Sequence, residues 1–337
     1  MTGSPTVSRV CIIIACGLAM LALSGAATWH WTQTWLDAPG PHQTEIIADL
    51  PRGTSLAGIA ARLQDAGAIE RPLLFRAAAM LSGKARRLKA GEYAFPPRTS
   101  PRMILWKLTI GEVLQHQISI AEGLSTHEIL ALVANVEPLH GALPPPPPEG
   151  SLLPETYNFP RRETRAALIA RMQTAQKLLL EKVWAARDAH IPLATPEDAL
   201  ILASIVEKET GIAAERPLIA GVFYNRLRIG MALQSDPTVV YARDKGVPND
   251  APISRTDLAM ESPFNTYKQP GLPPAPIANP GRAAIEAVLH PASTDALYFA
   301  ADGSGGHAFA TSLGEHNKNV ARLRAREKQP KNDSPEK

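Results

Sequence analysis

Cysteine is almost absent from this chain of 337 residues. The two that occur, Cys11 and Cys16, both lie in one apolar segment near the N-terminus. The rest of the chain therefore has no thiol, which excludes disulfide bonds and a cysteine nucleophile from that part. No lipoprotein-type sequence precedes Cys16, so the sequence does not indicate a lipidated cysteine.

A strong net charge is absent as well. The 35 Lys and Arg residues nearly balance the 32 Asp and Glu residues, and the formal net charge is +3. This is too small to indicate a nucleic-acid partner. A basic cluster at Lys84, Arg86, Arg87 and Lys89 could face an anionic lipid or polymer, but a solvated helix face explains it at least as well.

Several signatures of catalytic sites are also missing. The chain has 9 His but no HExxH motif and no His pair at helical ligand spacing. It has no GxSxG elbow and no GxxxxGK[ST] phosphate loop. The glycine-rich residues 303–306 stand between two predicted strands and do not open a helix toward a phosphate. These absences argue against serine hydrolases, zinc peptidases and NTPases, and we expect no metal and no cofactor.

The N-terminal segment at residues 10–27 contains no charged residue, follows Arg9, and is itself followed by Trp29, Trp31 and Trp35. It is just long enough to span a bilayer, and tryptophan at the exit suits the headgroup layer. Arg9 is a weak signal that the N-terminus is cytoplasmic.

We therefore predict a cytoplasmic N-terminus at residues 1–9 and an uncleaved transmembrane anchor at residues 10–31. The anchor would make the protein a single-pass protein of the cell inner membrane with its main domain in the periplasm. A cleaved signal peptide is the alternative, because residues 24–27 are small enough for a processing site.

The remaining chain predicts an α+β fold in two parts. After a linker at 32–44, residues 45–116 predict a small subdomain with the order strand, helix, helix, strand. This order and the stretch PRGTSLAGIA at 51–60 resemble the LysM carbohydrate-binding module; a plain α+β spacer is the alternative. Residues 117–325 predict a larger mixed helical and β domain, and the polar tail at 326–337 is expected to be disordered.

The larger domain contains a strongly apolar helix at residues 198–209 that turns acidic at its end. Its apolar positions 199, 202, 203 and 206 follow the spacing of a packed helix. A carboxylate at the end of such a helix is partly desolvated, which raises its pKa and suits a general acid. The alternative is a structural pair between Glu207 and one of the nearby arginines, Arg216, Arg226 or Arg228.

The helical wheel does not choose between the two acids of this helix. Glu209 falls inside the apolar stripe, and Glu207 lies to its side. Burial alone slightly favours Glu209 as the group with the more perturbed pKa.

Polar clusters interrupt the helical pattern at residues 149–157, 223–227, 233–238 and 263–267, the last before a stiff loop at 271–276. Their Gln, Ser, Asn and Tyr side chains suit sugar and amide recognition, although turn chemistry explains any single cluster more simply.

Taken together, these stretches resemble the endolytic murein transglycosylase family, also called YceG-like. The similarity rests on several motifs in the same order and covers roughly residues 45–325. The chain departs from the family pattern in the proline run at 144–148 and in Glu155, where an aspartate is expected. The matching stretches are LASIVEKET at 202–210, VFYNRL at 222–227, LQSDPTVVY at 233–241, the residues from Asn265 to Gly281, EGSLLPETY at 149–157, and the residues from Tyr298 to Asn317.

The resemblance implies that Glu207 is the catalytic residue, which overrides the wheel argument for Glu209. It implies non-hydrolytic cleavage of the MurNAc–GlcNAc β-1,4 bond in nascent peptidoglycan, which would leave 1,6-anhydroMurNAc ends and terminate strand elongation. Because the muramic C6 hydroxyl is the nucleophile, a second carboxylate is unnecessary, although a loop acid such as Asp236 could still be close in space. Peptidoglycan strands are the implied substrate and peptidoglycan synthases the expected partners.

A neutral, amide-rich polymer is best held by uncharged hydrogen-bonding groups and an aromatic face. We therefore expect Gln234, Ser235, Asn265 and Tyr267 to line a glycan groove beside Glu207. Tyr224 and Asn225 are expected to support this groove from the following helix. The alternatives are a non-catalytic, membrane-tethered peptidoglycan-binding or scaffold protein, and a water-using muramidase.

Overall fold

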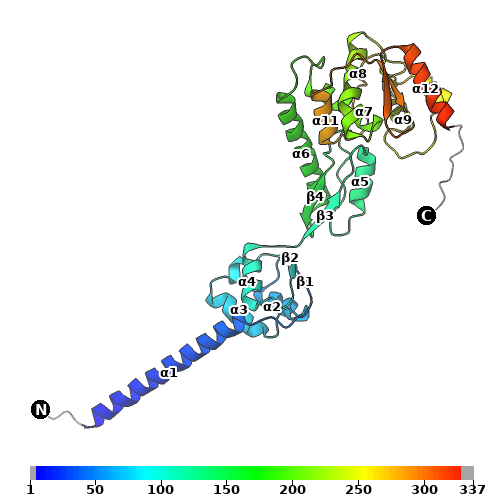
Figure 1. Ribbon diagram of the computed structural model, residues 1–337. Helices are drawn as coiled ribbons and strands as arrows, with labels where there is room; N and C mark the ends of the chain where they lie inside the picture. The colour runs from blue at the N-terminus through cyan, green and yellow to red at the C-terminus, as the bar shows by residue number, and fades with distance from the viewer. Residues whose placement is uncertain (1–4, 328–337) are drawn as a thin grey trace, which may run out of the picture. The chain divides into compact units, whose positions relative to one another are not determined.

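The chain forms two compact units. The computed structural model describes residues 5–327. The first unit holds the chain up to His116 together with Phe159–Arg161, and the second holds Gln117–Asn158 and the chain from Arg162 onward. Helices predominate in both, and the strands of the described residues form three two-stranded sheets (Figure 1). This is the mixed α+β class that the sequence predicts.

The N-terminal helix α1 spans Pro5–Asp37. Within it, Ile14–Asp37 is long and apolar enough to cross a membrane. The helix continues past residue 31, where the sequence analysis placed the start of a linker. The reason is that the first helix-breaking residues after the tryptophans are Pro39, Gly40 and Pro41, so nothing ends the helix earlier.

The rest of the first unit has the predicted order of strand, helix, helix and strand. Strands β1 and β2 pair antiparallel, with Ile46 opposite Phe95 and Leu50 opposite Gly91. Ser55 caps α2 by accepting a hydrogen bond from the Gly58 amide. The resemblance of this subdomain to LysM remains a prediction. The elements after α1 are β1 (Ile46–Leu50), α2 (Leu56–Asp65), α3 (Pro72–Leu81), the 3₁₀ turn η1 (Ala85–Arg87), β2 (Gly91–Phe95) and α4 (Pro101–Ile110).

The second unit is richer in helices than the sequence pattern predicted. The two strands predicted on either side of residues 303–306 are present as the antiparallel pair β5 and β6, and the end of the polar cluster at 149–157 belongs to β4. The helix α12 continues to Glu327, so the tail is still helical at residue 326, and residues 328–337 lie outside the described residues. Strands β3 (Gln115–Ser119) and β4 (Thr156–Pro160) run from one unit into the other, since residues 115–116 and 159–160 belong to the first. The other elements are α5 (Thr126–Ala134), α6 (Arg165–Ala185), α7 (Pro196–Glu209), η2 (Ala213–Glu215), α8 (Arg216–Arg228), α9 (Asp236–Asp244), α10 (Arg255–Leu258), α11 (Arg282–Leu289), β5 (Tyr298–Ala301), β6 (His307–Ala310) and α12 (Leu313–Glu327).

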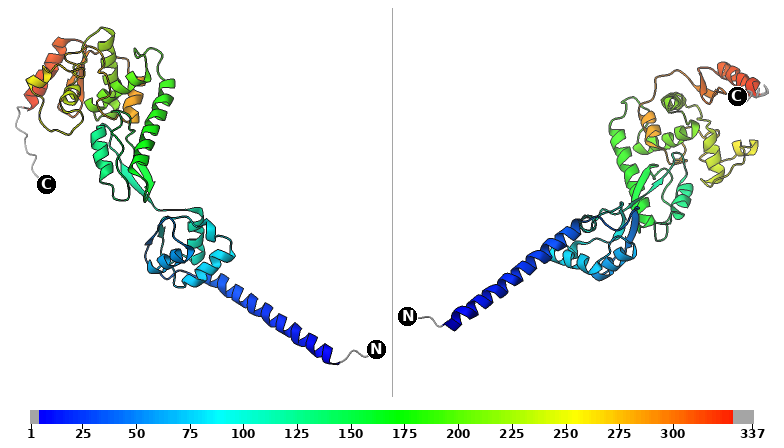
Figure 2. Two further views of the ribbon diagram at one scale, coloured as in Figure 1. Left: turned by 180° about the vertical axis from the view of Figure 1, so that it is seen from behind. Right: turned by 60° about the horizontal axis from the view of Figure 1, so that its bottom comes forward.

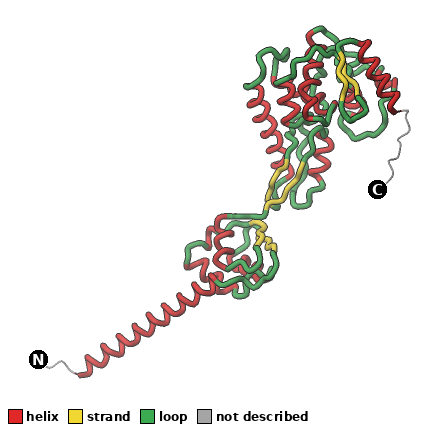
Figure 3. The backbone as a smooth tube through the Cα atoms, in the orientation of Figure 1, coloured by secondary structure: helices red, strands yellow, loops and turns green. Residues whose placement is uncertain are grey.

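Helix α7 is at the centre of the second unit. It packs against α6, α8, α9 and α11, and the helices α6, α7 and α11 lie side by side in the views of Figure 1 and Figure 2. Thr195 and Asp198 begin α7 with a capping box, and Pro196 occupies its first turn. Figure 3 shows the long loops that connect the helices, and α7 itself is buried over most of its length.

The helix caps offer a test of whether the two units unfold independently. Ser125 caps α5 in the second unit with a capping box and also donates to the Gly246 carbonyl oxygen. We expect Ser125→Ala to destabilise the second unit by about 1–2 kcal/mol, and Ser55→Ala to destabilise the first unit by a similar or smaller amount. Hydrogen exchange followed by mass spectrometry measures each unit separately. Equal loss of protection in both units in either variant would contradict independent unfolding.

Candidate active site at the end of helix α7

The apolar helix α7 carries two glutamates to its C-terminal end. Ile205 and Val206 are fully buried, and Glu207 and Glu209 follow them in the last turn. Thr210 then adopts an extended conformation and ends the helix. The same packing that buries the apolar side chains therefore holds both carboxyl groups against other elements of the protein.

The Glu207 carboxyl has two hydrogen-bond donors. The Arg216 guanidinium donates from Nη2 to Oε1 at 2.8 Å, and the Gly281 amide donates to Oε2 at 2.8 Å. The Glu207 side chain is only 4% exposed. The sequence analysis kept a structural pair with Arg216 as an alternative to catalysis, and the structure contains that pair.

A second carboxylate shares the same arginine. Glu122 Oε2 lies 3.4 Å from Arg216 Nη2, and the Glu122 side chain also lies against Gly281. A Cβ atom added at Gly281 would lie 1.8 Å from Glu122 Oε1, so any other residue there would displace the Glu122 side chain. Sequence reasoning missed Glu122, because it stands far from Glu207 in the chain and no local spacing connects the two.

The segment 277–281 brings the Gly281 amide to Glu207. The Ser204 hydroxyl of α7 accepts a hydrogen bond from the Ile277 amide at 3.0 Å. The fully buried Asn279 donates to the Leu124 carbonyl oxygen and to Glu149 Oε1. This segment is thereby attached both to α7 and to the loop before α5. It ends at the N-terminus of α11, where the Gly281 amide and the helix dipole favour a carboxylate.

The environment of Glu207 raises its pKa above the ordinary value. Burial is the largest cause, and the nearby Glu122 carboxylate acts in the same direction. The Gly281 amide and Arg216 oppose this rise. The carboxyl therefore holds a proton more readily than a solvated glutamate, while the donors keep it acidic enough to release that proton.

Glu209 has the larger shift, as the helical wheel predicted. Burial raises its pKa to about 7, and Asp236 contributes to the rise, while the Ser235 hydroxyl, His307 and Arg226 lower it. Ser235 Oγ donates a short hydrogen bond to Glu209 Oε1. By electrostatics alone Glu209 is thus also a candidate acid.

Two of the predicted binding loops lie together beside this end of α7. The Gln234 amide donates to the Thr266 carbonyl oxygen, and the Ser235 amide donates to Thr266 Oγ1. The Tyr267 hydroxyl donates to Asp236 Oδ1 at 2.6 Å. Gln234 is exposed and Tyr267 is partly exposed, so both side chains are accessible from solvent.

Other residues of the expected groove are buried and make their hydrogen bonds within the protein. Asn265 is fully buried, and its amide donates to the carbonyl oxygens of Leu258 and Met260. Ser235 is only 2% exposed. Their side chains have no surface for a glycan in this structure, because they hold the two loops in shape.

Tyr224 and Asn225 face away from the loops and toward α11 and the segment after it. The fully buried Tyr224 donates its hydroxyl to the Val288 carbonyl oxygen at 2.7 Å. Asn225 donates to the carbonyl oxygens of Thr294 and Ala296. Both residues stabilise the packing of α8, so their part in any site is indirect.

A pocket of about 450 Å³ is lined by Lys208, which follows Glu207 in the chain, and by Gly123; Glu207 itself is not among its lining residues. The Lys208 ammonium group donates to the Gly123 carbonyl oxygen, and Gly123 itself approaches the Glu207 side chain. The volume is within the range of ordinary small-ligand sites. Its walls mix carboxylates, one lysine, an aromatic ring and prolines; they include Ser125, Glu128, Asp236, Pro237, Tyr241, Asp244, Pro248 and Asn249.

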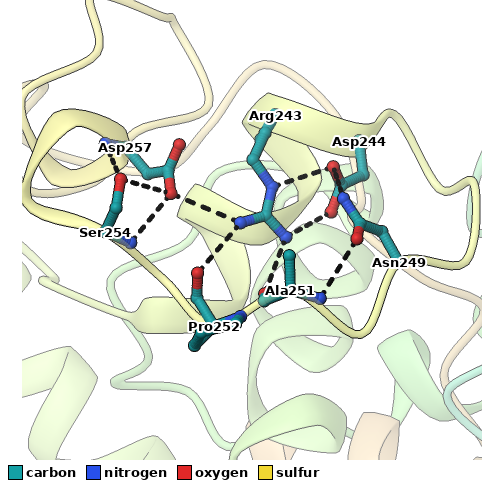
Figure 4. Close-up of polar contacts among 7 residues, drawn as sticks. All are labelled: Arg243, Asp244, Asn249, Ala251, Pro252, Ser254 and Asp257. Carbon is teal, nitrogen blue, oxygen red and sulfur yellow. Dashed lines mark hydrogen bonds and ion pairs between the residues drawn. The ribbon is translucent and has the colours of Figure 1, made fainter.

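An ion-pair network shapes one wall of this pocket. Arg243 pairs with Asp244 at 2.8 Å and with Asp257 at 3.3 Å, and it also donates to the carbonyl oxygens of Ala251 and Pro252 (Figure 4). Asn249 donates to Asp244 Oδ1 at 2.9 Å. The loop after α9 is thereby held to α9 and α10. Within the described residues, no group of three His, Cys, Asp or Glu is placed to hold a metal ion.

The fold and these motifs place the protein in a known class. The YceG-like family matches residues 48–322, and the chain belongs to this family. It is 32% identical over 307 residues to the endolytic murein transglycosylase of Bacillus subtilis, covering 82% of this chain and 84% of that protein. It is 28% identical to the endolytic murein transglycosylase of Streptococcus pneumoniae serotype 2, covering 93% of this chain and 65% of that longer protein.

A solved structure has a similar fold. A yceG-like protein from Listeria monocytogenes, determined by crystallography, is 29% identical in sequence and gives a TM-score of 0.50. The similarity covers 82% of this chain and 99% of that one.

The raised pKa of Glu209 predicts a change in stability with pH. The pKa of Glu209 is about 7 in the folded protein, and its ordinary value is 4.5. The stability that this group contributes to the folded state is therefore fully present below pH 4.5 and is lost as the pH rises through 7. The loss is on the order of 3 kcal/mol. Glu209→Gln cannot ionise and keeps an acceptor for Ser235, so its melting temperature should fall less than that of the wild type between about pH 5 and pH 8. Parallel losses in the two proteins would contradict this assignment.

Proposed function

We propose that this protein is an endolytic lytic transglycosylase of peptidoglycan, with Glu207 as its general acid and base. The observation that carries the proposal is the buried Glu207 carboxyl, whose pKa is raised and which has two fixed donors. The names of the curated relatives supply the substrate and the reaction class.

Protonated Glu207 would donate its proton to the oxygen that leaves with GlcNAc as the bond to muramic C1 breaks. The resulting carboxylate would accept the proton of the muramic C6 hydroxyl while that oxygen bonds to C1. The proton is thereby returned, no water is consumed, and the product carries a 1,6-anhydro end. Arg216 and the Gly281 amide stabilise the carboxylate between the two transfers.

The balance of burial and donors suits this double role. A catalytic acid that must also act as a base works best when its pKa is near the working pH. Burial and Glu122 raise the pKa of Glu207, and its two donors limit the rise. A fully solvated glutamate would be ionised too early, and a buried one without donors would not release its proton.

The pocket beside Lys208 is the proposed place for a disaccharide of the glycan strand. Its volume of about 450 Å³ and its mixture of polar groups with the Tyr241 ring are suited to a sugar. Gln234 and Tyr267 are the members of the expected groove that keep exposed surface. Ser235, Asn265, Tyr224 and Asn225 would support this site without direct contact.

A hydrolytic muramidase is the second candidate, and Glu122 is the observation that favours it. Ordinary glycosidases use two carboxyl groups on either side of the bond, and Glu122 shares Arg216 with Glu207. In the transglycosylase proposal Glu122 instead raises the pKa of Glu207 by its charge. The products separate the two mechanisms, since only the transglycosylase leaves anhydro ends.

The helix α1 would anchor the enzyme in the inner membrane, with the N-terminus in the cytoplasm and the second unit in the periplasm. The enzyme would then act on nascent strands close to the membrane, where peptidoglycan synthases are the expected partners. The first unit would hold the enzyme near its substrate, as a LysM-like subdomain would be expected to do.

The proposal predicts that Glu207→Gln abolishes glycan cleavage. The variant keeps the acceptor for Gly281 but has no proton to transfer, and a general acid and base is typically worth ~10²–10⁴-fold in rate. Glu209→Gln is the matched control on the same helix end and should lose much less. Mass spectrometry of digested peptidoglycan, with circular dichroism as a check on folding, measures both. Near wild-type cleavage by a folded Glu207→Gln variant would make Glu209 the next candidate.

Anchoring by α1 predicts that the full-length protein remains with membranes and keeps its N-terminal segment. Membrane fractionation and the intact mass of the purified protein test both points. A soluble product that begins near Ala27 would instead show that this segment is a cleaved signal peptide.

A further inference from the structure

Helix α3 exposes an apolar face that the proposed reaction does not use. Leu73 is 72% exposed, Met80 57% and Leu81 75%. The only charged residue of this helix is Arg76. A helix on the surface of a soluble protein normally turns polar residues outward, so this face is suited to a less polar environment than water.

Both ends of α3 lie against the C-terminal part of α1. At one end, the Arg71 guanidinium lies over the Trp31 ring at 5.5 Å. At the other end, Leu81 lines a pocket of about 270 Å³ together with Trp29 and Leu36. Trp31 and Trp29 of α1 thus lie near the start and the end of α3.

The part of α1 near α3 begins just beyond the apolar segment. At 1.5 Å per residue, Trp29 and Trp31 stand about 3 and about 6 Å beyond residue 27, and Leu36 stands about 14 Å beyond it. The headgroup layer on one side of a bilayer is roughly 5–7 Å thick. With residues 10–27 across the bilayer, Trp29 and Trp31 are at the depth of the headgroups and Leu36 lies beyond them, so α3 meets α1 in and just above the headgroup layer.

Positive charge follows directly after the apolar face. Arg86 and Arg87 are exposed in the turn η1, and Lys84 comes just before them. An apolar helix face next to lysine and arginine is the pattern of segments that lie in a membrane surface containing anionic lipids. The charge therefore complements a phospholipid surface.

We propose that α3 lies in the headgroup layer of the same membrane, with Leu73, Met80 and Leu81 in the acyl boundary and Arg86 and Arg87 on anionic phospholipid headgroups. This inference rests on the proposed anchoring by α1. The first unit is then fixed to the membrane at two places, by α1 and by α3, and cannot swing freely about α1.

Fluorescence quenching in vesicles tests this contact in the full-length chain. Cys11 and Cys16 are first replaced by Ser, and single cysteines labelled with the environment-sensitive dye NBD are then placed by Met80→Cys, Leu21→Cys or Ile47→Cys. Leu21 reports α1 itself, and Ile47 is a control on β1 with an exposed fraction of 55%, close to that of Met80. The vesicles contain phosphatidylcholine with or without phosphatidylglycerol, and a nitroxide lipid is the quencher.

We expect the label at position 80 to be quenched at least about twofold by a headgroup nitroxide, and the label at position 47 to stay bright. Arg86→Gln combined with Arg87→Gln should lower the quenching at position 80 only in vesicles with phosphatidylglycerol. Quenching at 21 without quenching at 80, equal quenching at 80 and 47, or a blue-shifted label at 80 that lipid nitroxides do not quench would overturn the proposal while α1 remains an anchor. A label at position 21 that a nitroxide on the lipid acyl chain does not quench would overturn the anchoring as well.

Discussion

The candidate site depends on a carboxyl group held out of water at the end of an apolar helix. An isolated buried carboxylate is costly, so such a group either takes up a proton or finds donors. Both effects act on Glu207. Burial and the nearby Glu122 carboxylate favour its protonated form, whereas Arg216 and the Gly281 amide favour its ionised form. The proposed chemistry requires this balance, because the same group must give a proton and take one back.

Much of the second unit positions the groups that set the pKa of Glu207. Helix α8 begins at Arg216 and packs on α7, which brings the guanidinium to Glu207. Segment 277–281 is attached to Ser204 and to the loop before α5, which fixes the Gly281 amide. Glycine at 281 leaves room for the Glu122 side chain, which occupies the place of a Cβ atom. Apart from the pair of Glu207 with Arg216, which are close in sequence, these contacts join parts of the chain that are far apart.

Sequence patterns therefore predict features that depend on neighbouring residues well. They predict features that depend on contacts between distant segments poorly. The two strands on either side of residues 303–306 and the raised pKa of Glu209 follow from spacing within a few residues, and the structure agrees with both. Helices α9 and α11 were missed because turn residues precede them and their apolar stripes are short. Glu122 and the burial of Asn265 were inaccessible to sequence patterns, since both depend on which segments meet in three dimensions. The assignment of Glu207 itself came from the family resemblance, because burial alone points to Glu209.

The central claim is that the substrate, and not water, supplies the oxygen that replaces the broken bond. Digestion of purified glycan strands in water enriched in heavy oxygen, followed by mass spectrometry of the new ends, tests it most directly. The account predicts anhydro ends with no heavy oxygen in the wild-type protein, because the muramic C6 oxygen forms the new bond to C1. Reducing ends that carry one heavy oxygen each would contradict it and would assign to Glu207 and Glu122 the two-carboxylate hydrolysis of an ordinary muramidase.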